Sequence, residues 1–131
     1  MESEHLLADI PQKALIERAG QILLTRGKEI QWDLPGGRLH IGEDPIDGLR
    51  REIREELRLD IEPLDIIHTF VFTSKSVAHY VVIYRGNVRG SIEEMKVDES
   101  EIGGILWVGR DEFEDLPMRD GYKEALRKFF A

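Results

Sequence analysis

The amino-acid sequence predicts an α/β fold, a sandwich built around a mixed β-sheet. The first observation is an amphipathic helical pattern over residues 45–58, near the middle of the chain. The second is that segments rich in β-branched and aromatic residues lie on both sides of it, which favours strands before and after a central helix. The third is that no repeat, low-complexity tract or linker interrupts the 131 residues. We therefore expect one domain over residues 1–131.

The first half of the chain predicts a strand pair followed by the helix. Residues 12–17 and 21–25 are the expected strands, with a turn at Gly20 between them. Extended chain from residue 32 is expected to run into a turn at residues 35–37. Asp44 is the expected N-cap of the helix, because Pro45 suits its first position and Asp47 its first turn.

The second half predicts more strands and a closing helix. Residues 66–73, 77–85 and 105–108 have the composition of strands. The acidic, glycine-containing segment 86–104 is expected to be mainly a loop. Residues 121–130 predict an amphipathic helix, because Tyr122, Leu126 and Phe129 share one face.

Composition and charge narrow the class of protein. The chain is 41% hydrophobic and 34% charged, carries a net charge of −8 and has no cysteine, which excludes disulfides and thiolate catalysis. An acidic surface should repel nucleic acid and anionic membranes, so we expect neither as a partner. No secretory signal and no membrane-spanning apolar run is evident, and a cytoplasmic location is expected. A small phosphorylated ligand would need a divalent cation to carry positive charge.

The helix 45–58 carries three kinds of side chain on three arcs, at about 100° per residue. The stripe expected to pack on the sheet is Ile46, Leu49, Ile53 and Leu57. An acidic arc at spacing i, i+3, i+4 is Glu52, Glu55 and Glu56. Arginines on the other flank are Arg50, Arg54 and Arg58.

The acidic arc predicts either a metal site or a solvated charged face. Like charges at this spacing oppose each other by a few tenths of a kcal/mol per exposed pair, roughly. A hard cation such as Mg²⁺ or Mn²⁺ would turn that repulsion into attraction and could bridge to phosphates. The alternative is an acidic helix face partly neutralised by Arg51 and its neighbours.

A fixed pattern of glycine, glutamate and arginine surrounds the arc and favours the metal site. Gly37 is followed after five residues by Glu43, and after seven more by the run REIREELRL, which ends at Leu59. This pattern resembles the Nudix box, G-x5-E-x7-R-E-U-x-E-E-x-G-U, in which U is apolar. Every position agrees except Arg58, which stands where the box has its second glycine. The preceding residues WDLPGG are also similar to the family's usual approach to the box.

Arg58 is the one departure, and it falls at the expected helix end. A glycine there would adopt a left-handed conformation at no steric cost. Arginine must either take up that conformation at a cost or end the helix differently. We expect altered geometry after Leu57 and intact metal binding, because Arg58 lies outside the acidic arc.

The resemblance implies an α/β/α sandwich with the box as loop–helix–loop. It implies hydrolysis of a nucleoside diphosphate linked to another group, by water attacking phosphorus with the help of Mg²⁺ or Mn²⁺. The metal ligands that it implies are Glu52, Glu55 and Glu56, with the carbonyl of Gly36. Glu52 is the expected base, although family members differ in this choice, and Glu55 and Arg51 complete the expected catalytic set. Glu43 is expected to pair with Arg51 and orient Glu52, or else to be a stabilising contact only.

A further metal-binding carboxylate is expected on the loop before the late strand. The candidates are Glu93, Glu94, Glu99 and Glu101. Glu101 is favoured because it stands six residues before Trp107, as in some nucleoside-triphosphate members of the family. The alternative is that Glu101 simply belongs to an acidic surface loop.

Selection between substrates must come from groups outside the box. Arg85 and Arg89 are expected to contact a phosphate or a sugar hydroxyl, and Phe72 and Tyr80 to face a base. A nucleoside triphosphate is favoured over ADP-ribose or a nucleotide sugar, because the ADP-ribose subgroup commonly has a proline soon after the box and none occurs between Pro63 and Pro117. A catalytically idle, nucleotide-sensing domain is a further alternative, which the intact glutamates oppose. Monomer and homodimer both stay open.

Overall fold

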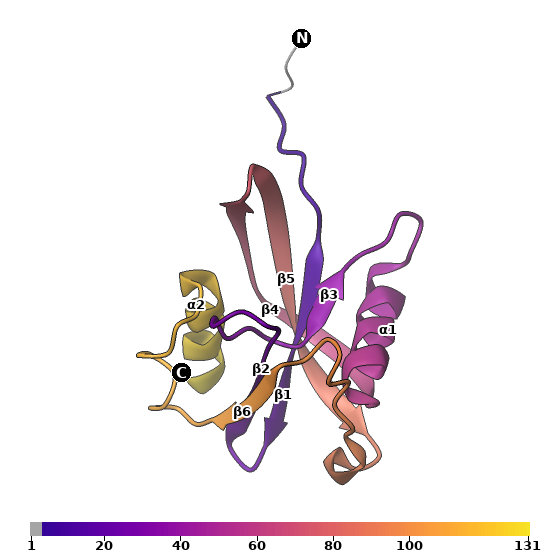
Figure 1. Ribbon diagram of the computed structural model, residues 1–131, viewed down its shortest axis with the longest axis vertical. Coiled ribbons are helices and arrows are strands. Elements are labelled where there is room, and N and C mark those ends of the chain that lie inside the picture. The colour runs from indigo at the N-terminus through magenta and orange to yellow at the C-terminus, as the bar shows by residue number, and fades with distance from the viewer. Residues whose placement is uncertain (1–3) are drawn as a thin grey trace.

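A mixed β-sheet lies between two α-helices in the computed structural model, which describes residues 4–131 (Figure 1). The strands are β1 (Pro11–Arg18), β2 (Gln21–Arg26), β3 (Gly36–Arg38), β4 (Asp60–Ser74), β5 (Val77–Arg89) and β6 (Gly104–Val108). The helices are α1 (Pro45–Leu57) and α2 (Asp120–Phe130), with a short 3₁₀ helix η1 at Ile92–Glu94.

The strand order is β4-β5-β1-β2-β6, and β3 pairs with β1 off this path. The β1–β5 pair is parallel and the other strand pairs are antiparallel, so the predicted mixed sheet is confirmed. Neither helix in residues 4–131 is long and apolar enough to span a membrane.

The alternation of side chains along the strands explains the two layers of helix. In β1, Leu15 packs in a cluster with Tyr122 and Leu126 of α2, while Ala14 and Ile16 pack in a second cluster against α1. Because each central strand is apolar on both faces, the sheet must be covered twice. The expected α/β/α sandwich follows, with α1 and α2 on opposite sides (Figure 1).

Helix α1 begins where the sequence predicts. The Asp44 carboxylate accepts hydrogen bonds from the backbone N–H groups of Ile46 and Asp47, at 3.0 and 3.2 Å. This satisfies two of the four donors that a helix N-terminus leaves unpaired. Three members of the apolar stripe, Leu49, Ile53 and Leu57, are fully buried.

Helix α1 ends in a different way from the one expected. Arg58 adopts the left-handed conformation, with φ 56° and ψ 30°, and its N–H donates to the Arg54 carbonyl at 3.0 Å. The expectation of altered geometry after Leu57 is therefore wrong. The arginine keeps the conformation of the family's glycine because the chain must turn at once into β4, whose residue Ile61 is completely buried.

The substitution Arg58→Gly is expected to stabilise the protein modestly. A left-handed conformation costs a non-glycine residue about 1–2 kcal/mol in steric strain, and glycine removes this cost. The greater freedom of glycine in the unfolded chain offsets about half of the gain in stability. Thermal and urea melting of the two proteins measure the difference. A clear loss of stability would mean that contacts of the arginine side chain, such as its electrostatic attraction to Asp98, outweigh the strain.

Two strands are longer than the sequence predicts. Strand β4 begins at Asp60 and β5 ends at Arg89, so residues 86–89 of the segment 86–104 belong to a strand, while most of that segment is the expected loop. The extra pairing was hidden because Pro63 lies opposite Gly86, and both residue types are poor strand formers. Residues 36–38, placed in or next to a turn by the sequence, form β3 through pairing with β1.

Candidate active site

Two carboxylates of α1 lie against the glycine pair at the start of β3. The backbone N–H of Gly36 donates to Glu56 Oε1 at 3.0 Å. A side chain on Gly36, whose φ is 138°, would collide with the Gln12 carbonyl of β1. A Cβ on Gly37 would occupy the place of the Glu52 carboxylate. Glycine at both positions therefore lets the helix, β3 and β1 approach closely enough to hold these carboxylates.

Arg51 connects the box loop to the helix carboxylates. Its Nε and Nη2 donate to the two carboxylate oxygens of Glu43 at 2.7 and 3.1 Å, which is the ion pair expected from the sequence. Its Nη1 donates to Glu52 Oε1 at 3.2 Å. The hydrogen bond from Arg51, followed by one from the His40 N–H, lowers the pKa of Glu43 to about 2. Glu43 thus stays ionised and fixes the guanidinium beside Glu52.

Glu55 lies at the rim of this arrangement. Its side chain is 52% exposed, against 15% for Glu52, and it contacts the Nη1 of Arg51 at 3.3 Å. Glu52 and Glu56 therefore form the inner part of the site, and Glu55 faces solvent.

Glu56 is in an environment that opposes its ionisation. Burial is the main cause that raises its pKa to about 7, and the negative charges of Glu52 and Glu101 add to it. Lys13 and the Gly36 N–H act in the opposite direction. The interaction with Glu101 places this loop residue near the helix carboxylates, although it is 45 positions from Glu56 in the chain (101 − 56).

The donor chemistry of this region fits a hard cation. The carboxylates of Glu52 and Glu101 both act on that of Glu56, and Gly36, whose N–H binds Glu56, brings its carbonyl to the same region. Among residues 4–131, no three acidic or histidine side chains already meet at ligand spacing. The guanidinium of Arg51 contacts both Glu52 and Glu55.

The raised pKa of Glu56 predicts how the stability of the metal-free protein changes with pH. The folded protein binds this proton more tightly than the unfolded chain, whose value is 4.5, so the stabilisation is complete below pH 4.5 and is lost as pH rises through about 7. Wild type should lose on the order of 3 kcal/mol relative to Glu56→Gln between pH 4.5 and 8. Urea unfolding of both proteins with EDTA measures this, and parallel pH curves would contradict it.

A cavity of about 580 Å³ opens on the α2 side of the sheet, and its lining includes Arg38 of the box and Asp33, which precedes the box. The aromatic side chains in its lining are Trp32, Phe72 and Tyr122. The cations in its lining are Lys28, Arg38 and Arg119. Asp33 joins the cavity to the carboxylates, because it pairs with Lys13 at 3.2 Å and Lys13 interacts with Glu56. The carboxylates of α1 thus lie next to a cavity that is lined by aromatic rings and by charges of both signs, since Glu29 also lines it.

Of the four residues expected to select substrate, only Phe72 lines this cavity. The Arg119 guanidinium covers its ring at 3.8 Å from Cζ to the centroid, so a stacked base would have to displace Arg119. Tyr80 follows His79, whose ring is 4.6 Å from that of Phe72, and successive strand residues face opposite sides of a sheet. Tyr80 therefore points away from Phe72.

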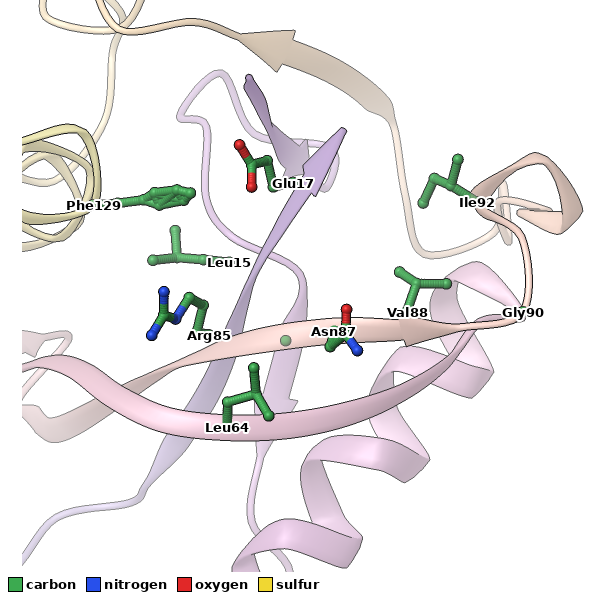
Figure 2. Close-up of a pocket in the computed structure, with 10 residues that line it drawn as sticks. Leu15, Glu17, Leu64, Arg85, Asn87, Val88, Gly90, Ile92 and Phe129 are labelled. Carbon is green, nitrogen blue, oxygen red and sulfur yellow. The ribbon is translucent and has the colours of Figure 1, made fainter. Parts of the chain in front are cut away.

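The two arginines of β5 lie elsewhere. Arg85 pairs with Asp65 at 2.9 Å and lines a separate cavity of about 320 Å³ with Glu17 and Phe129 (Figure 2). Arg89 pairs with Glu62 of β4. Cross-strand carboxylates thus engage both guanidinium groups.

Sequence reasoning missed Lys13, Asp33, Arg38 and Arg119. The sequence contained a signal for Lys13, because this residue directly precedes the apolar residues 14–16 in a predicted strand. A charged residue at such a position has to find a partner. The others depend on pairings distant in the chain. Arg119, for example, reaches Phe72 from the N-cap of α2.

The class of this protein is defined by the α/β/α sandwich and by the glycine pair Gly36 and Gly37, which lies against carboxylates of α1. A model of the NUDIX domain matches residues 14–129. The chain belongs to the Nudix family.

Individual relatives agree with this assignment. An uncharacterized Nudix hydrolase of Bacillus subtilis (strain 168) is 31% identical over 102 residues, which is 76% of this chain and 65% of that protein. A MutT-like protein of Streptomyces ambofaciens is 26% identical over 99 residues, 75% of this chain and 61% of that protein. The chain thus spans less than two thirds of the length of these two curated relatives. The crystal structure of a MutT protein from Methanosarcina mazei Go1 has a TM-score of 0.82 at 24% identity, over 97% of this chain and 96% of that one.

Proposed function

We propose that the chain is a metal-dependent pyrophosphohydrolase that cleaves a phosphoanhydride bond in a nucleoside diphosphate linked to another group. The observation that carries the proposal is the placement of Glu52 and Glu56 against the glycine loop, beside a cavity lined by aromatic and cationic side chains. Phosphoryl transfer depends mainly on positioning and charge neutralisation, which such a site can supply.

Each part of the site has a role in this proposal. Bound Mg²⁺ or Mn²⁺ would neutralise phosphate oxygens and make water more acidic. Glu52, Glu55, Glu56 and Glu101, with the Gly36 carbonyl, would hold it. Glu52 takes the proton of the attacking water, and Arg51 orients Glu52 while Glu43 fixes Arg51.

The favoured substrate is a nucleoside triphosphate. Three cations, Lys28, Arg38 and Arg119, line the cavity against two carboxylates, Glu29 and Asp33, in a protein of net charge −8. These cations supply donors for phosphate oxygens beyond the attacked bond. Trp32 and Phe72 supply ring faces for a base, provided that Arg119 moves from Phe72. ADP-ribose and nucleotide sugars are the alternative, because two phosphates and two sugars would also use these cations as hydrogen-bond donors.

The test is a panel of nucleoside triphosphates, ADP-ribose and nucleotide sugars with Mg²⁺ or Mn²⁺, with the products separated by chromatography. Hydrolysis should disappear with EDTA and return when metal is added. The Glu52→Gln protein, purified in parallel, controls for contaminating enzymes. Turnover that survives removal of metal would contradict the proposal. Binding of a nucleotide without any hydrolysis would favour the sensing alternative.

A further inference from the structure

We propose that the ammonium group of Lys13 binds a phosphate oxygen of the substrate, at the junction of the carboxylates and the cavity, and that Asp33 positions it. The inference rests on the proposed function, because it names a residue that acts on the substrate of that same site.

The position of Lys13 is fixed by two strands. In the β1–β3 pair it lies directly opposite Gly36, the residue whose N–H holds Glu56. On its other side β1 pairs with β5, where Lys13 faces Ile83. Its side chain is only 11% exposed. A lysine in such a strand has little freedom, so its ammonium is held close to the box.

Asp33 restricts the ammonium further. Its Oδ2 accepts from Lys13 Nζ at 3.2 Å, while its Oδ1 accepts from the Leu34 N–H at 2.6 Å. Burial, followed by the charge of Asp33, raises the pKa of Tyr122, which places Asp33 beside that phenol as well. Asp33 also lines the large cavity, so the ammonium group that it holds lies next to that cavity.

Lys13 therefore lies between the two parts of the site, the carboxylates and the cavity. On one side its charge acts on Glu56, and on the other its Nζ pairs with Asp33, a cavity-lining residue whose side chain is 38% exposed. A substrate whose phosphates reach the carboxylates while its nucleoside occupies the cavity must pass this point. A nearly buried ammonium with one carboxylate partner retains donor capacity, since lysine has three N–H donors.

The charge of Lys13 should weaken the binding of a divalent cation and strengthen the binding of the substrate phosphates. Near Glu56 it repels a divalent cation, yet it attracts phosphate oxygens. If Lys13 only stabilised the fold, its removal would not change the affinities for the cation and for the phosphate ligand in opposite directions. The structural and phosphate-binding roles can therefore be distinguished by measuring both.

The experiment compares wild type with Lys13→Met, which removes the charge but keeps a similar unbranched chain. Mn²⁺ binding is measured by electron paramagnetic resonance, and binding of α,β-methylene-ADP in saturating Mn²⁺ by calorimetry. Mn²⁺ should bind a few-fold more tightly to Lys13→Met, while the analogue should bind about tenfold more weakly or worse, as expected for a lost charged hydrogen bond. Arg127→Met, which removes an exposed cation paired with Glu114 of the α2 side, is the matched control and should change neither.

Asp33→Asn tests the positioning role separately. It should weaken analogue binding when Lys13 is present and have no further effect in the Lys13→Met background. If Lys13→Met melts below the assay temperature, Lys13→Gln, which keeps a polar group near Asp33, replaces it with the same expected outcome.

Each remaining result is decisive. Tighter Mn²⁺ binding with unchanged analogue binding would show that Lys13 only balances the carboxylates, and would overturn the assignment. Equal weakening of both ligands with a lower melting temperature would assign Lys13 to the fold alone. Wild type that binds neither probe would overturn the proposed function itself, and the role of Lys13 with it.

Discussion

Replacing Glu52 by glutamine is expected to lower kcat by about two to four orders of magnitude, the usual contribution of a positioned general base. Glutamine keeps the shape of the side chain but cannot take a proton from water. Among the helix carboxylates, Glu52 is the most suitable general base. It is largely buried, lies against Gly37 and accepts a hydrogen bond from Arg51 at 3.2 Å. Its loss should lower kcat for every substrate alike, because the chemistry is shared.

Steady-state kinetics on any substrate that wild type cleaves measures this effect, with thermal melting to confirm the fold. Glu17→Gln is the matched control, since Glu17 is an exposed carboxylate beside the separate cavity in Figure 2 and should leave kcat unchanged. Glu55→Gln gives the informative comparison, because Glu55 is the exposed member of the arc. If Glu52→Gln turns over near the wild-type rate while Glu55→Gln or Glu101→Gln does not, the base has been assigned to the wrong carboxylate.

The parts of the fold that local sequence determines could be predicted. The cap at Asp44 and the buried stripe of α1 depend on residues within a few positions of one another, and both are present. The sheet edges could not be predicted so well. Pro63 and Gly86 are poor strand formers, yet β4 and β5 pair through these positions as far as Asp60 and Arg89.

The same division applies to the site. The Nudix box holds Glu43, Arg51 and Glu52 in one loop and helix, so the resemblance to the box made the Glu43–Arg51 pair predictable. The cavity could not be predicted, because its lining residues, such as Asp33, Phe72 and Arg119, come from segments that are distant in the chain. The charge of Arg85 favours a substrate contact, and the sequence does not show that Asp65, on the neighbouring strand, forms an ion pair with it.

Gly37→Ala is expected to lower kcat by about 100-fold in a folded protein, although it adds only one methyl group. The new Cβ would clash with Glu52 Cδ, so the Glu52 carboxylate must move away from residue 37. The side chain of Glu52 can rotate, so the stability of the fold should change little. Displacement of a reacting group by about 1 Å can itself cost about 10²-fold in rate.

A double-mutant cycle separates this mechanism from general destabilisation. Gly37→Ala should have almost no further effect in a Glu52→Ala background, because the clash has been removed. Gly20→Ala is the control for backbone strain, since Gly20 has φ 80° with open space around its Cβ position and lies in the β1–β2 turn. It should lower the melting temperature and leave kcat unchanged. If Gly37→Ala slows the Glu52→Ala protein as much as wild type, its effect does not pass through Glu52, and the close fit of loop and carboxylate is not what sets the rate.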